Sequence, residues 1–113
     1  MTKKKIVAII TALTGDRVIV TEEAIEHVAN EHFQFVPQDI LLEIIERILK
    51  DPSALYRDVR EINREFNFFY RLESGEFIVA VVKIIPEGAY LASVYPTGKK
   101  PRNKHKGFKK VKI

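Results

Sequence analysis

The second half of the chain constrains the fold most, because three apolar stretches follow one another there with only short turns between them. The stretches are Phe66–Leu72, Glu76–Ile85 and Ala89–Tyr95, and the turns are Ser74-Gly75 and Pro86-Glu87-Gly88. Strands joined by turns this short pair antiparallel, since a parallel connection needs about a dozen residues or more. The pattern therefore predicts an antiparallel meander of three strands.

The turns also predict how these strands align. Centring the first turn on Ser74-Gly75 places Tyr70 opposite Val79, and the second turn places Val79 opposite Tyr95. We expect the more apolar face of the sheet, which includes Ile78, to pack against helices. The other face is predicted to carry Phe66, Phe68, Tyr70, Val79, Val81, Lys83, Leu91, Ser93 and Tyr95. A shift of one residue would exchange the two faces.

The first half begins with a predicted β-hairpin, formed by Lys4–Leu13 and Arg17–Val20 around a Gly15 turn. A short helix follows, because Thr21 is a suitable N-cap and the acidic residues after it suit the positive end of a helix dipole. After Pro37 a second helix is expected, with a wide apolar stripe; Asp51-Pro52 ends it.

The connection from Ser53 to Glu65 is polar and of mixed charge, so we expect it to be irregular. The whole pattern predicts an α+β fold in which an N-terminal β-hairpin and two helices pack on a twisted antiparallel sheet. A chain of 113 residues is long enough for one compact domain, which we assign to residues 1–98. Residues 99–113 are expected to form a basic C-terminal tail outside it.

The basic charge is concentrated in that tail. From residue 97 onward the chain has eight Lys or Arg residues and no acidic one, whereas residues 1–96 hold 11 basic and 15 acidic residues, a net charge of −4. A basic run of this kind is typical of a polyanion-binding segment, although it could also be a solvated tail. RNA-binding candidates are Lys83, Lys99, Lys100, Arg102, Lys104, His105 and Lys106.

Two of the three histidines, His27 and His32, lie in the first helix. Histidine is the usual proton carrier in catalysis without a metal, because its ordinary pKa lies nearest neutrality. His27 falls on the polar side of the helix, whereas His32 continues the apolar side and could be a core residue. Their spacing is not that of a helical metal pair, and Glu26 and Glu31 complete no ligand set, so we expect neither metal nor cofactor.

The order of segments resembles a known family. The run I-V-T-E-E-A-I-E-H-V-A-N-E-H, an aliphatic helix, D-P, and a β-rich second half ending in Y-P-T are similar to the phage-associated branch of the barnase–EndoU–colicin–RelE-like ribonucleases. The resemblance spans residues 18–97. It implies RNA cleavage without a metal on the open side of the sheet, to a 2′,3′-cyclic phosphate, with His27 as the first site residue and His32 as the second.

We therefore expect a metal-independent endoribonuclease, either a toxin or a phage-encoded effector, that acts on RNA in the cytoplasm of its own or of a target cell. A cognate antitoxin or immunity protein is a candidate partner, and no membrane association is expected, since the longest apolar run is interrupted by Lys83. The catalytic candidates are His27, His32, Arg71, Tyr95 and Thr97. Two alternatives remain: a nucleic-acid-binding module without catalysis, and an interaction protein of the immunity or antitoxin type.

Overall fold

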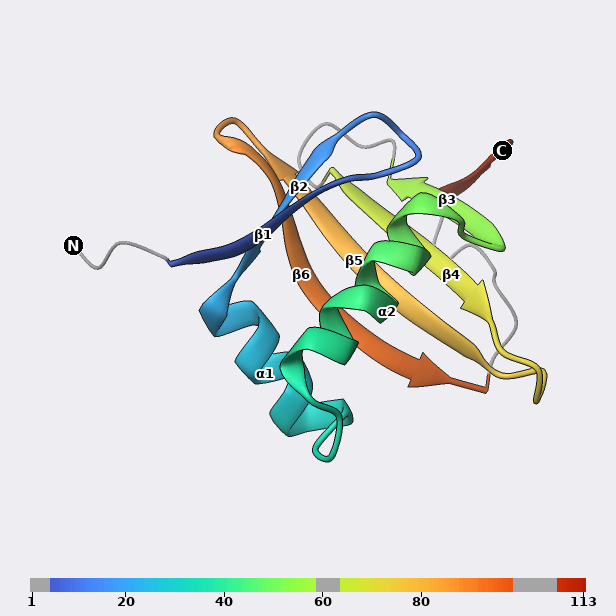
Figure 1. The fold of residues 1–113 in the computed structure, drawn as a ribbon. Helices are drawn as coiled ribbons and strands as arrows, with labels where there is room; N and C mark the ends of the chain where they lie inside the picture. Colours follow the sequence, from blue (N-terminus) through green and yellow to red (C-terminus); the bar gives the residue numbers. More distant parts are fainter. Residues whose placement is uncertain (1–4, 59–63, 99–107) are drawn as a thin grey trace.

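The computed structural model describes residues 5–58, 64–98 and 108–113 (Figure 1). Within these ranges the helices are α1 (Glu22–His32) and α2 (Gln38–Lys50). The strands are β1 (Ile6–Thr11), β2 (Arg17–Thr21), β3 (Ala54–Asp58), β4 (Glu65–Arg71), β5 (Phe77–Ile85), β6 (Gly88–Thr97) and β7 (Phe108–Val111). They form one sheet in the order β1-β2-β6-β5-β4-β3-β7. All neighbours pair antiparallel except β2 and β6, so the predicted α+β class is confirmed.

α1 begins, and α2 begins and ends, where the sequence predicts. The Thr21 hydroxyl accepts a hydrogen bond from the Ala24 N–H at 3.2 Å, which caps the first turn of α1. Pro37 precedes α2, and Asp51 is the residue at which α2 ends. The N-terminal hairpin is also confirmed, since β1 and β2 pair around the turn at Gly15.

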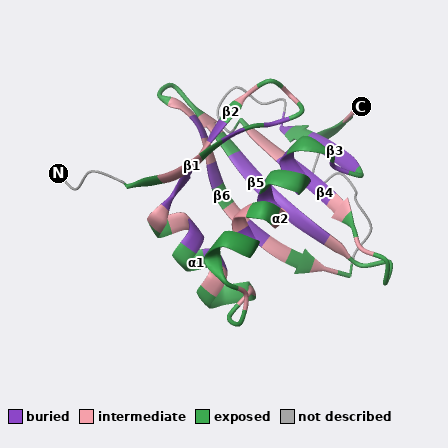
Figure 2. Cartoon of the chain, in the orientation of Figure 1, coloured by how far each residue is buried: buried purple, intermediate pink, exposed green. Residues whose placement is uncertain are grey.

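The main core lies between the two helices and one face of the sheet (Figure 2). Ile25 of α1, Ile45 of α2 and Phe68 of β4 are fully buried there, and the central strand contributes Ala80 and Val82. A side chain of this size stabilises the folded state by roughly 1.5–3 kcal/mol when it is fully buried. This packing holds α1 against the sheet, which matters for the site described below.

A second, smaller cluster lies on the opposite face of the sheet. Its members are Ala54, Tyr56, Phe69, Val79 and Val81, with Phe77 and Tyr95 packed against them. The ring centroids of Tyr56 and Phe69 are 5.6 Å apart in an edge-to-face arrangement.

The register of the first turn was predicted wrongly, by one residue. The Leu72 N–H donates to the Glu76 carbonyl at 2.8 Å, and Gly75 between them has a φ of 93°, so the turn contains three residues instead of two. Phe69, not Tyr70, therefore stands opposite Val79. The predicted pairing of Val79 with Tyr95 is confirmed.

This shift moves three residues of β4 to the other face. Because side chains alternate along a strand, the shift places Phe66, Phe68 and Tyr70 on the helix-covered side, where they contact the main core. Leu91 was also assigned to the wrong face. A β-bulge in β6 causes this: Val81 pairs with Ser93, but the next residue, Val82, pairs with Leu91. Leu91 therefore faces the helices and belongs to the main core.

Two strands lie where none was predicted. The segment Ser53–Glu65 contains β3, whose Leu55 and Tyr56 are buried. The expected basic tail contains β7, which pairs antiparallel with β3, with Tyr56 opposite Lys110. At residues 108–111 the tail is therefore part of the sheet. Neither of the described helices is long and apolar enough to span a membrane.

Candidate functional site

A cleft forms where β2 leaves the sheet. β2 runs parallel to β6 only at Val18–Ala89 and Ile19–Tyr90, after which the chain turns at Thr21 into α1. From that point α1, instead of a strand, lies beside β6 (Figure 1). Since a helix cannot continue the hydrogen-bonded ladder of a sheet, the space between α1 and the β5–β6 hairpin stays open.

We call this space the α1 cleft. It has a volume of about 570 Å³. It is lined by Thr21, Glu23, Ala24, His27, Lys83, Ile85, Glu87, Tyr90, Leu91 and Ala92. The cleft thus unites His27, the first catalytic candidate, with Lys83, a cation predicted to bind RNA. Both side chains are exposed to solvent.

The sheet places Lys83 within a row of otherwise apolar side chains. Lys83 follows Val79 and Val81 on the same face of β5, and its direct partner across the β5–β6 ladder is Tyr90. The bulge lies next to this pair: Ser93 is opposite Val81 and Leu91 is opposite Val82, which leaves Ala92 as the extra residue. Bulges of this kind re-aim neighbouring side chains and are frequent beside active sites.

Two carboxylates in the α1 cleft were not among the predicted site residues. Glu23 lies one helical turn before His27, a spacing that brings the two Cβ atoms within about 5–6 Å. Glu87 comes from the β5–β6 turn. With His27 neutral, Lys83 and these two carboxylates give the lining a formal charge of −1. The cleft therefore holds acid–base groups, and it does not by itself attract a polyanion.

His32 is not a core residue. His32 lies at the end of α1 and is exposed. The buried position suggested by the apolar side of the helix is therefore wrong. Its ring centroid lies 6.1 Å from that of Tyr95 on β6. Tyr95 is opposite Val79, four residues from Lys83 along β5, or about 13 Å. The pair His32–Tyr95 therefore lies outside the lining of the α1 cleft.

Arg71 and Thr97 lie still farther from the α1 cleft. Both are direct strand partners of Phe77, on β4 and β6 respectively. Phe77 and Lys83 are six residues apart on β5, which corresponds to about 20 Å. The five catalytic candidates thus occupy three places, and only His27 lies in the cleft with a strand cation.

Most of the predicted RNA-binding residues lie outside the described ranges; they are Lys99, Lys100, Arg102, Lys104, His105 and Lys106. Of the neighbouring lysines, Lys109, Lys110 and Lys112 are described and exposed. Lys110 shares the face of its partner Tyr56, which is the face that carries Lys83. Three strand spacings, about 14 Å, separate β7 from β5.

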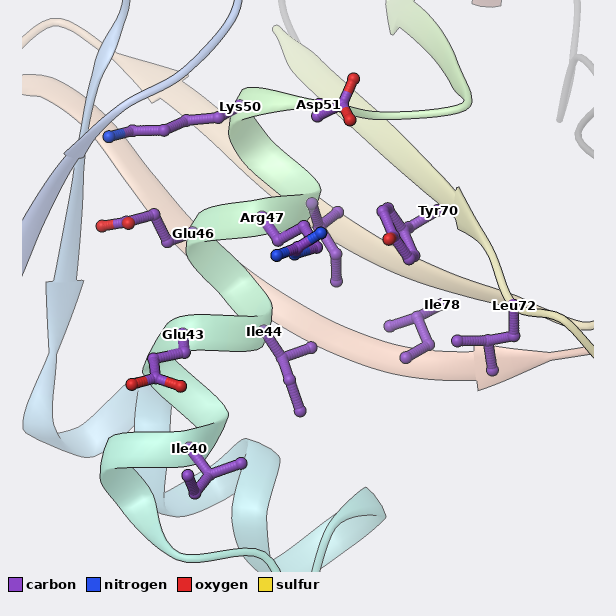
Figure 3. A pocket seen from close by; sticks show the side chains of 11 residues that line it. Ile40, Glu43, Ile44, Glu46, Arg47, Lys50, Asp51, Tyr70, Leu72 and Ile78 are labelled. Atoms are coloured by element: carbon purple, nitrogen blue, oxygen red, sulfur yellow. The ribbon is translucent and has the colours of Figure 1, made fainter.

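A second cavity lies on the helix-covered side, between α2 and the end of the β4–β5 hairpin (Figure 3). It has a volume of about 690 Å³ and a largely apolar lining that includes Ile44, Tyr70 and Ile78. Arg47 extends from α2 toward this cavity (Figure 3). None of the predicted catalytic residues lines it, so it is not a candidate for the predicted chemistry.

Among the residues that the structure describes, no three His, Asp or Glu side chains are grouped so that they could hold a metal ion. Comparison of the chain with protein-family models, curated proteins and solved structures gave no match. The resemblance to ribonucleases therefore stays a prediction, and the roles of the cleft residues are argued from their chemistry alone.

Proposed function

We propose that the chain is a metal-independent endoribonuclease with its catalytic centre in the α1 cleft. The observation that carries this proposal is that His27 and Lys83, from opposite halves of the sequence, line the same cleft. A proton carrier and a cation are two of the groups that phosphodiester cleavage by an internal nucleophile uses. The α+β architecture, with both helices on one sheet face, supports the proposed relation to the barnase–EndoU–colicin–RelE-like fold.

In this reaction RNA supplies its own nucleophile. A base removes the 2′-hydroxyl proton, the 2′-oxygen attacks phosphorus, and the bond from phosphorus to the 5′-oxygen breaks as that oxygen takes a proton from an acid. The products are a 2′,3′-cyclic phosphate and a 5′-hydroxyl. We assign one proton transfer to His27 and the other to Glu23 or Glu87, which line the same cleft. Lys83 stabilises the negative charge that develops on the phosphoryl oxygens.

Attraction of RNA has to come from outside the cleft, because the cleft lining has a negative formal charge. The basic residues after position 97 supply it in this proposal, and three of them, Lys109, Lys110 and Lys112, are exposed. Lys109 and Lys110 belong to β7, which forms the edge of the sheet beyond β5, β4 and β3 from β6. A bound strand would therefore cross the sheet from β7 toward the α1 cleft.

A nucleic-acid-binding module without catalysis is the second candidate. The observation that favours it is the distance between the described basic residues and the cleft: Lys109 and Lys110 lie on β7 at one edge of the sheet, whereas the α1 cleft lies beside β6. In that case the RNA affinity of the basic segment would not depend on His27.

A defined single-stranded oligonucleotide, incubated with the protein in EDTA, separates the two candidates. The nuclease proposal predicts fragments that end in a 2′,3′-cyclic phosphate, and no cut where a 2′-deoxynucleotide replaces the residue before the cleaved bond. Binding without any fragment would favour the binding module. Cleavage that EDTA abolishes and a divalent ion restores would contradict the proposed mechanism.

A further inference from the structure

The two edges of the sheet differ in how they are protected. β7 forms one edge, and two of its four residues are Lys109 and Lys110. β1 forms the other edge, and its six residues, Ile6–Thr11, include no charge and no proline. Natural sheets normally protect an edge with lysine, proline or a short strand, because its free N–H and C=O groups can pair with another chain. Of these three features β7 has two, its lysines and its short length, and β1 has none; the register of β1 against β2 is irregular only between Ile6 and Ala8, before Ile9.

The outer edge of β1 offers both hydrogen-bonding groups and apolar surface. The Ala12 N–H donates inward to the Asp16 carbonyl at 2.9 Å, so by alternation Thr11 and Ile9 direct their N–H and C=O groups outward. Ile9 is 49% exposed, although it is a large apolar residue in a strand. It lies on the face away from the helices, since its neighbour Ile10 belongs to the main core.

We propose that β1 pairs antiparallel with β1 of a second copy of this chain, about a two-fold axis near Ile9. A second copy presents the same surface, which is the arrangement that a two-fold interface requires. Lys5 stands immediately before β1 and is exposed. A parallel pairing would bring the two Lys5 side chains together, whereas an antiparallel pairing places them at opposite ends.

The paired strands would join the two sheets into one and bury each Ile9 against its copy. Because the axis is perpendicular to the sheet, the two α1 clefts would lie on the same face of the dimer. Five strand spacings separate β6 from the β6 of the second copy, which corresponds to about 24 Å. The pairing itself rests on the edge alone and does not depend on the proposed nuclease activity.

Sedimentation equilibrium of the full chain tests this inference. From about 1 to 300 μM, the range expected for a small interface, the wild-type mass should rise from 13.0 kDa toward twice that value. Ile9→Lys should keep the monomer mass, because the two new charges would face each other. Ile85→Lys is the matched control, since Ile85 is 44% exposed on the same face of an internal strand; it should dimerise like the wild type.

A second variant removes a hydrogen bond instead of adding charge. Thr11→Pro deletes an outward N–H that no described strand uses, so it should abolish the dimer while the thermal unfolding transition is retained. A wild-type protein that stays monomeric up to 300 μM overturns the inference. A dimer that persists in both Thr11→Pro and Ile9→Lys also overturns the inference, since the interface would then lie elsewhere.

Discussion

Lys83 stands directly opposite Tyr90 across the β5–β6 ladder, at the point where β2 leaves the sheet and α1 takes its place. A cation from the second half of the chain thereby lines the same cleft as a histidine from the first half. The α1 cleft follows from the departure of β2, because α1 lines one wall and the β5–β6 hairpin lines the other.

Replacing Lys83 tests whether the cation acts on the scissile phosphate. Lys83→Gln should lower the cleavage rate by about 10²-fold, the cost of losing one group that stabilises developing charge. Arg71→Gln is the matched control, because Arg71 is an exposed strand cation about 20 Å away, and its rate should change by less than about twofold. Equal losses in the two variants would indicate general attraction of RNA instead of a role in the cleft.

His32→Ala should leave the free energy of unfolding nearly unchanged, within about 0.5 kcal/mol, because His32 is exposed. Urea denaturation measures this directly. The cleavage rate of the His32→Ala variant should fall far less than that of His27→Ala, since His32 lies beside Tyr95 and not in the α1 cleft. A rate loss as large as that of His27→Ala would mean that the catalytic centre extends to the end of α1.

Thr21→Ala should lower the free energy of unfolding by about 1 kcal/mol, because it removes the side-chain cap of α1. Thr21→Ser keeps the hydroxyl and should lose less than half of that amount. Thr21 is a buried residue, so if both variants lose the same amount in urea denaturation, the loss comes from its methyl group and not from the cap.

The basic segment can be tested without disturbing the sheet. Changing Lys99, Lys100, Arg102, Lys104 and Lys106 to Gln removes five charges and leaves β7 intact. The slope of log affinity against log salt should become shallower by about 0.7 for each phosphate that these residues engage on single-stranded RNA. An unchanged slope would show that these residues do not bind RNA.

Deleting residues 108–113 should instead lower the melting temperature, because β7 pairs with all but the first residue of β3 and Val111 packs against the main core. A melting temperature equal to that of the full chain would show that β7 contributes nothing to stability.

The sequence predicts the elements whose signals are local. Thr21, Pro37 and Asp51 set the helix ends, and Gly15 sets the first hairpin. The register of β4 was missed because a three-residue turn and a two-residue turn around Gly75 differ by only one position in the sequence. That single position decides whether Phe68 faces the helices.

The elements that depend on distant partners were not predictable. β3 and β7 are short, and each contains two charged residues, so neither has a clear strand pattern of its own. β3 is a strand because β4 and β7 pair with it, and β7 is a strand because it pairs with β3. The α1 cleft depends on the parallel contact of β2 with β6, which no local pattern reveals. His27 could be singled out as a proton carrier, but Glu23 and Glu87 gain a role only from their position beside it.

The rate of RNA cleavage by His27→Ala in EDTA tests the central claim most directly. A defined single-stranded RNA, followed by the appearance of cyclic-phosphate ends, should be cut about 10²-fold more slowly than by the wild type, the usual contribution of a general acid or base. Glu26→Ala, an exposed neighbour on α1 outside the cleft lining, should keep the wild-type rate, and both variants should melt as the wild type does. A folded His27→Ala protein with the full wild-type rate would contradict the account.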